Sequence, residues 1–269
     1  MAIDLDVALQ RMVATAREAG KVTQAHFDRF RDIEIGVKGP ADFVSDADRE
    51  SELLIRDRLG SFYPGFAFIG EEFPPEAGGG SDMSWLVDPI DGTTNFVCGM
   101  DYTISIALRQ GQKTVAGALY NPVRDEMFTA IARRGAFLNG DRLKVSDRVD
   151  TGLMAIGTGL PIPGLFTYDG FYERLDRLRA PVGAVRIVGS SANSCAYVAC
   201  GRLTGYYEQS GLIDWAVGVL LVQEAGGVVT DWWGRGPEVY DKTGCVIAAN
   251  PATHAYLIEA LKDAPRLDP

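Results

Sequence analysis

One nine-residue segment, Asp88 to Phe96, constrains the fold of this chain more than any other part. It reads Asp-Pro-Ile-Asp-Gly-Thr-Thr-Asn-Phe and follows a short apolar run, Ser84 to Val87, that is typical of a strand. Proline fixes one backbone angle, so Asp88 and Asp91 are expected to lie in a tight, stiff turn at the strand end. Two carboxylates held so close repel each other and need a cation or a buried proton between them. The segment therefore predicts a site rather than an ordinary Asp-Gly turn.

The same residues indicate which ligand the carboxylates would hold. Magnesium prefers hard oxygen ligands, usually one or two carboxylates together with water and substrate phosphate. Paired magnesium ions about 3.5–4 Å apart can clamp the attacking and leaving oxygens of a phosphoryl transfer. Gly92 lets the backbone approach a phosphate closely, and a helical turn beginning beside it would offer free N–H groups to an anion. The Thr93 hydroxyl can orient a water molecule. The segment thus favours magnesium-dependent chemistry on a phosphate.

Composition disfavours several other classes of function. The 269 residues include 26 Lys and Arg against 36 Asp and Glu, and the net charge of −10 opposes general binding of nucleic acid or of an anionic membrane. No apolar run reaches the roughly 18 residues of a membrane span, and the N-terminus lacks the basic-then-apolar order of a signal peptide. His26 and His254 are expected in helices near the two chain ends, so carboxylates must carry most of the chemistry.

The cysteines point to a reducing compartment. No two of them form a C-x-x-C pair, so a zinc site is disfavoured and free, buried thiols are expected. We therefore expect a cytoplasmic protein. The four are Cys98, Cys195, Cys200 and Cys245.

The first half of the chain is expected to combine two helices with an antiparallel sheet. Apolar residues at helical spacing and good capping residues predict the helices, and short apolar runs bounded by turn residues predict the strands. Glu71 and Asp88 each follow such a run, and strand ends are where functional groups are usually displayed. The expected elements are helices from Leu5 to about Phe30 and from Ser45 or Asp46 to Gly60, strands Phe66–Ile69 and Ser84–Val87, an antiparallel meander of Tyr102–Leu108, Thr114–Tyr120 and Glu126–Ala132, and a further hairpin from Gly135 to Val145.

The second half is expected to be α/β, because strands and helices alternate there. The polar stretch Ser146 to Asp150 is the predicted boundary, which divides the chain into an α+β part, residues 1–146, and an α/β part, residues 147–269. The expected order is Met154–Gly157 (strand), Tyr168–Leu178 (helix), Ala184–Val188 (strand), Asn193–Gly201 (helix), Gly205–Glu208 (strand), Asp214–Ala225 (helix), Val228–Asp231 and Cys245–Ala249 (strands), and Ala252–Leu261 (helix).

Taken together, these motifs resemble the inositol monophosphatase family of magnesium-dependent, lithium-sensitive phosphatases. Four blocks occur in the family's order and span nearly the whole chain, and a small-residue turn is similar to one that touches substrate in the family. The resemblance implies a layered α-β-α-β-α sugar-phosphatase fold. The blocks are Lys38–Asp48, Phe68–Glu72, Asp88–Phe96 and Tyr207–Gly227, and the turn is Gly189–Ala192.

The resemblance implies where metal would bind. Two magnesium ions are expected, with a weaker third, where present, held near Glu71 through water. The first ion would be bound by Glu71, Asp88 and the carbonyl of Ile90, and the second by Asp88, Asp91 and Asp214. Residues 1–146 would then supply most of the metal ligands, and residues 147–269 would supply the substrate pocket and one ligand.

It also implies catalytic and substrate-binding roles. Thr93, hydrogen-bonded to Asp48, would activate the attacking water beside Glu71. Lys38 and Asp42 would lie on a mobile loop that covers the site. The substrate would be contacted by the Gly92, Thr93 and Thr94 amides, by Gly189, Ala192 and Glu208, and by Asp91 and Asp214.

The sequence departs from the family pattern near its last motif. The family has a tryptophan directly before the aspartate, whereas this chain reads Ile213-Asp214-Trp215. The loop between Glu208 and Asp214 is one residue shorter than in animal members, and Ser45 replaces a commoner threonine. The metal role of Asp214 is kept, while the shape of the pocket near Glu208 is left open.

The expected reaction is one-step hydrolysis of a small phosphorylated metabolite without a phosphoenzyme. The first choice of substrate is myo-inositol 1-phosphate or a similar polyol phosphate. Histidinol phosphate, fructose 1,6-bisphosphate and 3′-phosphoadenosine 5′-phosphate are alternatives within the superfamily. A regulatory protein that binds RNA or a polymerase, and a metal-binding scaffold without turnover, are alternatives from other classes. The resemblance also implies a homodimer.

Overall fold

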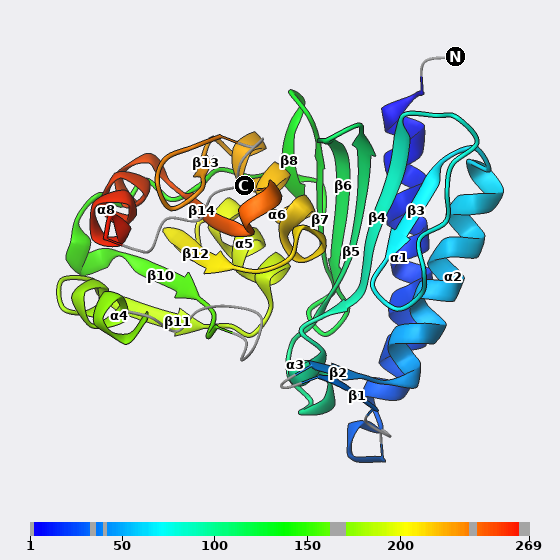
Figure 1. The fold of residues 1–269 in the computed structure, drawn as a ribbon, viewed down its shortest axis with the longest axis horizontal. Coiled ribbons are helices and arrows are strands. Elements are labelled where there is room, and N and C mark those ends of the chain that lie inside the picture. Colours follow the sequence, from blue (N-terminus) through cyan, green and yellow to red (C-terminus); the bar gives the residue numbers. More distant parts are fainter. Residues whose placement is uncertain (1–2, 33–35, 40–41, 162–170, 237–240, 264–269) are drawn as a thin grey trace.

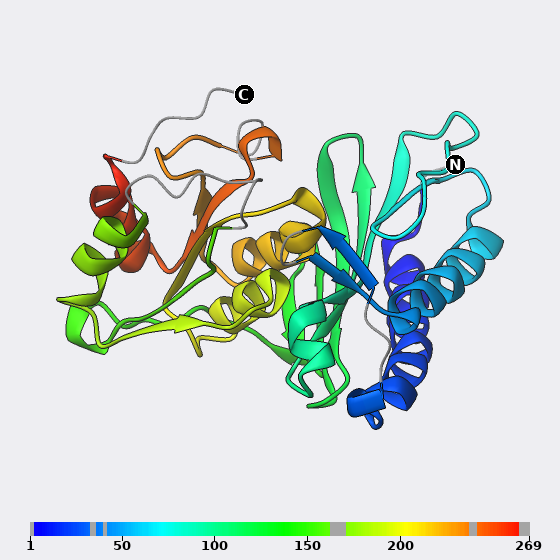
Figure 2. The same cartoon turned by 60° about the horizontal axis from the view of Figure 1, so that its bottom comes forward.

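The computed structural model describes residues 3–32, 36–39, 42–161, 171–236 and 241–263, without the side chains of residues 32, 37–39 and 42–44. Its strands form two large sheets and a small hairpin (Figures 1 and 2). The hairpin pairs β1 (Gly36–Gly39) with β2 (Asp42–Val44) in antiparallel fashion. Within these residues, none of the helices is both long and apolar enough to cross a membrane.

The larger sheet has seven strands in the order β3-β4-β5-β6-β7-β8-β9. Neighbouring strands run antiparallel except at one edge, where β3 lies parallel to β4. The expected meander is thus confirmed for β5 to β7, and the expected hairpin for β8 and β9. The strands are β3 (Ala67–Gly70), β4 (Met83–Asp91), β5 (Thr103–Gln110), β6 (Lys113–Asn121), β7 (Glu126–Ile131), β8 (Gly135–Leu138) and β9 (Asp141–Arg142).

Two long helices, α1 (Leu5–Phe27) and α2 (Asp46–Phe62), cover one face of this sheet (Figure 1). A 3-10 turn, η1 (Phe30–Asp32), follows α1. Gly20 lets α1 lie close to the sheet, since a Cβ there would come within 2.6 Å of the Tyr120 ring. The layer is sealed by apolar side chains from both helices and the sheet, among them Met12, Ala16, Ile55, Leu59, Trp85, Ile106 and Ala118.

The opposite face of the sheet carries the middle layer, α5 (Ser191–Ala199) and α6 (Leu212–Glu224). From Trp215 to Val222, α6 is buried on every side, as expected for a helix that is apolar all round. Gly117 of the sheet and Gly218 of α6 allow close packing, because a Cβ at either would come within 3 Å of a neighbouring side chain. One continuous core therefore joins the first sheet, these helices and the second sheet.

The second sheet has five strands in the order β11-β10-β12-β14-β13. The first three run parallel and the last two antiparallel to their neighbours. Helices α4 (Phe171–Arg179) and α8 (Pro251–Leu261) cover its outer face, which completes the predicted α-β-α-β-α layers. The strands are β10 (Ala155–Thr158), β11 (Ala184–Ile187), β12 (Gly205–Gln209), β13 (Val228–Thr230) and β14 (Cys245–Ala249), and η2 (Thr151–Leu153) precedes them.

The sequence prediction was wrong about where β4 ends. It placed Asp88 and Asp91 in a turn beyond a strand that ended at Val87, whereas β4 continues to Asp91. The chain can stay in the sheet because the register shifts between Asp88 and Asp91, which accommodates Pro89. The predicted start of helix α4 at Tyr168 lies outside the described residues. The division at 146/147 stays a prediction; the strands of the first sheet end at Arg142 and those of the second begin at Ala155.

Candidate active site

The site begins at the irregular end of β4. Asp88 pairs with Ser105 and Asp91 with Thr103, so two residues of β4 oppose a single residue of β5. Such a bulge bends a strand and redirects its side chains. Asp88 and Asp91 are both buried, and the Asp88 carboxylate accepts the Ile90 N–H at 2.9 Å. The bulge therefore brings both carboxylates into the interior from one strand.

Helix α3 (Thr93–Val97) starts directly after this bulge, as the sequence predicted. Its N-cap, Gly92, has a φ of 95°, a left-handed conformation that favours glycine. The Thr93 hydroxyl lies 3.2 Å from the Ile90 carbonyl and 3.4 Å from the Asp48 carboxylate. A hydroxyl has one hydrogen, so these two acceptors are alternatives. The predicted pair of Thr93 and Asp48 is thus within reach, although the two residues are 45 positions apart.

Asp48 is held in place by the start of α2. It is fully buried, and one of its oxygens accepts both the backbone N–H of Ser45 at 2.8 Å and the Ser45 hydroxyl at 2.6 Å. Its other oxygen faces Thr93. The hydroxyl at position 45 thus serves to orient Asp48, which gives a physical reason why serine can replace threonine there.

Asp91 connects the first sheet to the middle helices. Its carboxylate accepts the hydroxyls of Thr103, at 3.2 Å, and Ser190, and the backbone N–H groups of Ser191 and Ala192 at 3.3 and 3.0 Å. The last two belong to the first turn of α5, where a negative charge is favoured. Burial nevertheless raises the pKa of Asp91 to about 6 against these donors. In this structure the Ala192 amide thus donates to Asp91, and Gly189, directly before the cap, lies against Asn95.

Four carboxylates from three parts of the chain gather here. Glu71 follows β3, Asp88 and Asp91 belong to β4, and Asp214 is the third residue of α6, where it accepts the Gly211 N–H at 2.9 Å. Burial is the main cause that raises the pKa values of Asp88 and Asp214 well above their ordinary range. The charges of the other acids raise both further. The structure thus brings together every side chain that the sequence assigned to metal.

Three of these four acids have no basic partner in the part of the chain that the structure describes. No ion pair among the described residues involves Asp88, Asp91 or Asp214. Glu71 and Asp88 instead share a hydrogen bond, which requires a proton between the two carboxyl groups. A shared proton and a bound cation are two ways to relieve the same repulsion.

The donors in this cluster are suited to a hard cation, since all are oxygens: four carboxylates and the nearby Ile90 carbonyl. As the side chains stand, no three Asp, Glu, His or Cys of the described residues converge closely enough to hold one ion. The chemistry of the site therefore fits magnesium, and binding would require the proton shared by Glu71 and Asp88 to leave and their oxygens to turn toward the ion.

Glu208 lies on the second sheet, at the end of β12, and faces the same region. One of its oxygens accepts the hydroxyls of Tyr206 and, at 3.3 Å, Ser191. Burial raises the pKa of Glu208 to about 7, and the charge of Asp91 contributes to the rise. Gly159 makes room for the carboxylate, because a Cβ there would lie 1.7 Å from Glu208 Oε1.

Sequence reasoning missed several of these neighbours. Ser190, Ser191 and Tyr206 hold the two carboxylates, and Gly159 shapes the space around Glu208. Their only signal was indirect, because Ser190 and Ser191 lie in the small-residue turn already noted. Beyond Glu208 opens a small pocket lined by Thr158, Gly159, Arg174, Tyr207, Glu208 and Trp232 among others.

The predicted covering loop is described only in its backbone. Lys38 lies on β1 and Asp42 on β2, and their side chains fall outside the described part of the chain. The hairpin they form lies beside α3, the helix that begins at Thr93 (Figure 1). Its role as a mobile cover stays a prediction.

Comparison with known proteins identifies the family. The model of the inositol monophosphatase family matches residues 4–266. An inositol-1-monophosphatase of Mesorhizobium japonicum is 40% identical over 94% of this chain and 96% of its own. The Nus factor SuhB of Escherichia coli is 35% identical to this chain, and the alignment covers 93% of this chain and 94% of SuhB. The crystal structure of the extragenic suppressor protein SuhB from Bartonella henselae superposes with a TM-score of 0.91 at 38% identity, covering 96% of this chain and all of that one.

The fold and the similarity to these relatives define a phosphoric monoester hydrolase. The chain belongs to the inositol monophosphatase family, as the sequence motifs predicted.

Proposed function

We propose that this protein hydrolyses myo-inositol 1-phosphate or a similar polyol phosphate with the help of Mg²⁺. The observation that carries the proposal is the convergence of Glu71, Asp88, Asp91 and Asp214 beside the Thr93–Asp48 pair. Uncompensated buried acids need a cation, and the pair next to them is suited to holding a water. The names of the relatives at 40% and 38% identity, both inositol-1-monophosphatases, support the same substrate class.

The acidic cluster would hold the metal. Glu71, Asp88 and the Ile90 carbonyl would bind one ion, Asp88, Asp91 and Asp214 a second, and a weaker third would bind near Glu71. Bound Mg²⁺ supplies positive charge for the phosphate oxygens and lowers the pKa of water. The Ile90 carbonyl has two lone pairs, so it can accept from Thr93 and still contribute to metal binding.

Thr93 would position the attacking water. When its hydroxyl donates to Asp48, 3.4 Å away, the oxygen lone pairs of Thr93 are free to accept a hydrogen from that water. Asp48 is fixed by Ser45, so its second oxygen faces Thr93 before substrate binds. The amides of Gly92, Thr93 and Thr94 would hold the phosphate at the start of α3, where helix N–H groups lack partners within the helix.

Glu208 would recognise the leaving group. Its Oε2 accepts Tyr206 and Ser191, whereas no donor among the described residues reaches Oε1. That oxygen lies against Gly159, next to the pocket lined by Thr158 and Tyr207. A hydroxyl of a polyol or sugar phosphate would donate to Oε1. Gly189 and Ala192 would border the same space through the turn that carries Ser190 and Ser191.

The test is a phosphate-release assay across a panel of substrates. We expect the highest kcat/KM for inositol 1-phosphate or another polyol phosphate, compared with histidinol phosphate, fructose 1,6-bisphosphate and 3′-phosphoadenosine 5′-phosphate. Excess chelator should abolish release, and added Mg²⁺ should restore it. Full activity in the presence of chelator would contradict the metal role, and a clear preference for histidinol phosphate would replace the substrate assignment.

A regulatory role is the second candidate, because the relatives at 35–36% identity are named Nus factor SuhB. The net charge of −10 favours a protein partner over direct contact with RNA. Filter binding to RNA and pull-down with RNA polymerase, each run beside the phosphatase assay, would separate the two functions. We further propose a cytoplasmic homodimer, sensitive to lithium, on the strength of family membership.

A further inference from the structure

A buried carboxylate outside the acidic cluster lies against the loop that carries Glu71. Glu52, on α2, is completely buried. Its two oxygens accept the backbone N–H groups of Glu72 at 2.7 Å and Phe73 at 3.3 Å. A buried charge is tolerated only when it is paired and hydrogen-bonded. Here the partners are the two amides that directly follow Glu71.

The residue before Glu71 is fitted to the same carboxylate. Gly70 ends β3, and a Cβ added to it would lie 2.2 Å from Glu52 Oε1. Any side chain at position 70 would therefore displace Glu52. Glu52 thus contacts the backbone on both sides of Glu71, with van der Waals contact before it and hydrogen bonds after it.

Arg56, one turn further along α2, completes the arrangement. Its guanidinium lies 3.0 Å from Glu52 and 2.6 Å from Glu76, and it is within 3.4 Å of the Pro74 carbonyl. It also lies over the ring of Phe68, 4.6 Å from the centroid. The chain from Phe68 to Glu76 therefore wraps around a buried ion pair whose two members belong to one rigid helix.

We propose that Glu52 and Arg56 are positioning residues that hold Glu71 in the metal site. The proposal rests on the proposed function, because it takes Glu71 as a metal ligand. When both carboxylates are ionised, as metal binding requires, Asp88 repels Glu71, and Glu71 sits on a loop that this repulsion would push away from the cluster. Hydrogen bonds from Glu52 to the next two amides oppose that movement, and Arg56 balances the charge that Glu52 adds. Partners of this kind typically change metal affinity 10- to 100-fold when they are removed.

The test replaces Glu52 by its neutral isostere, Glu52→Gln. We expect the dissociation constant for Mg²⁺, measured by calorimetry, to rise about tenfold, while kcat at saturating Mg²⁺ changes by less than about threefold. Amide hydrogen exchange should accelerate at Glu72 and Phe73 and stay unchanged in β5 and β6. If the role of Glu52 were merely structural, the substitution would lower the stability of the protein, but it would not weaken Mg²⁺ binding while leaving kcat nearly unchanged.

The matched control is Glu50→Gln, two positions earlier on the same helix. Glu50 is exposed and pairs with His26 of α1 at 3.0 Å. The same chemical change there should leave Mg²⁺ affinity and hydrogen exchange at Glu72 and Phe73 as in the wild type.

If Glu52→Gln fails to fold, Arg56→Lys serves as the test instead. Lysine keeps the positive charge but cannot reach Glu52 and Glu76 together. We expect this variant to bind Mg²⁺ about threefold more weakly than the wild type.

Calorimetry and hydrogen exchange need no turnover, so the outcome can be separated from that of the phosphatase assay. If the protein released phosphate from none of the substrates, the proposed function would be wrong, but the Mg²⁺ dissociation constants of the variants could still be compared. Wild-type Mg²⁺ affinity together with wild-type exchange at Glu72 and Phe73 in folded Glu52→Gln would overturn the positioning role, and so would a loss confined to kcat.

Discussion

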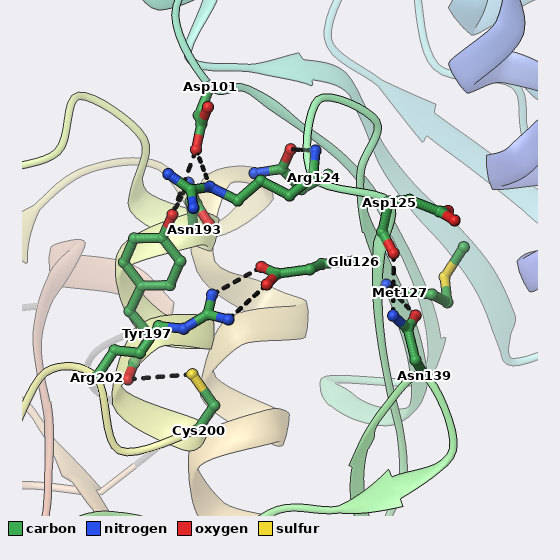
Figure 3. A network of polar contacts seen from close by, with 11 residues as sticks. Asp101, Arg124, Asp125, Glu126, Met127, Asn139, Asn193, Tyr197, Cys200 and Arg202 are labelled. Atoms are coloured by element: carbon green, nitrogen blue, oxygen red, sulfur yellow. Dashed lines mark hydrogen bonds and ion pairs between the residues drawn. The ribbon is translucent and has the colours of Figure 1, made fainter.

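Helix α5 meets the first sheet at two polar regions that differ in one respect, the balance of charge. At its N-terminus, Asp91 joins a cluster of acids, and among the described residues Asp88, Asp91 and Asp214 form no ion pair. Toward its other end, each acid faces an arginine: Arg124 pairs with Asp101, and Arg202 pairs with Glu126 at 2.7 Å (Figure 3). Both regions join the same helix to the same sheet. Only the first has the uncompensated charge that marks a site built for a ligand.

The balanced region is held together by further contacts around Tyr197. Its hydroxyl lies 3.5 Å from Asp101 and 3.4 Å from the Asn193 amide, and the Arg202 guanidinium lies 5.2 Å from the centre of its ring. Figure 3 shows these side chains reaching across from α5 and the turn after it to the strands of the first sheet. We interpret this region, which we call the arginine network (Asp101, Arg124, Glu126, Tyr197 and Arg202), as a structural joint. The comparison predicts that damage at one end of α5 affects chemistry and damage at the other affects stability.

The largest expected effect is that of Asp91→Asn. Removing this charge should lower kcat/KM by roughly 10²–10³-fold, because a ligand and charge of the reaction centre is lost. The protein should stay folded, since the change also relieves repulsion from Asp88 and Asp214. Phosphate release measures the loss of kcat/KM, and thermal unfolding of the same sample shows whether the variant is folded. Near-normal turnover would break the comparison.

The pH dependence of stability should differ between the two ends of α5. Burial raises the pKa of Asp91 to about 6 and that of Glu208 to about 7. An acid with a raised pKa in the folded state stabilises the fold at low pH, and this contribution disappears as the pH rises through the folded value. Metal-free protein should therefore lose on the order of 2 kcal/mol between pH 4 and 7 from Asp91 alone.

Denaturant unfolding at several pH values checks this expectation. Mg²⁺ should reduce the loss, because it favours the charged carboxylates and stabilises the folded state by binding. Asp91→Asn should flatten the curve, whereas a substitution in the arginine network should only shift it. A stability that rises from pH 5 to pH 7 without metal would contradict the assignment.

The smallest effect is expected in the arginine network itself. Arg202→Ala removes the pair with Glu126, and because the arginine side chain is 40% exposed, solvent screens much of that interaction. We expect a loss of about 1 kcal/mol in the free energy of unfolding and kcat/KM within twofold of the wild type. Arg134→Ala, which breaks an exposed pair with Asp6 at 2.6 Å, serves as the control and should cost less.

The fold was largely predictable because its signals are local. The period of apolar residues predicts α1, α2 and the strands of the meander, and the alternation after Asp150 predicts the second sheet. The end of β4 was not predictable in detail. A proline and two aspartates read as a turn, and only pairing with β5, which skips one residue, keeps that segment in the sheet.

The candidate site was predictable as a set of acids, and its supporting contacts were not. Asp88 and Asp91 stand out because they are close in sequence, and Glu71 and Asp214 because of the family motifs. Ser190 and Ser191 stand out only as part of the small-residue turn Gly189–Ala192, without a role of their own, and Glu52 carries no signal. Their contacts join residues about 20 to 100 positions apart, which no local pattern records. The roles assigned to the site residues stay predictions until they are tested.

The position of α6 has a consequence for folding. This helix is enclosed between the two sheets and carries Asp214, while the other three acids come from the first sheet and its edge. The acidic cluster is therefore complete only when α6 has packed against the first sheet. During refolding, the affinity for Mg²⁺ should therefore return only once α6 has packed against the first sheet. Metal binding therefore reports whether α6 has packed against the first sheet.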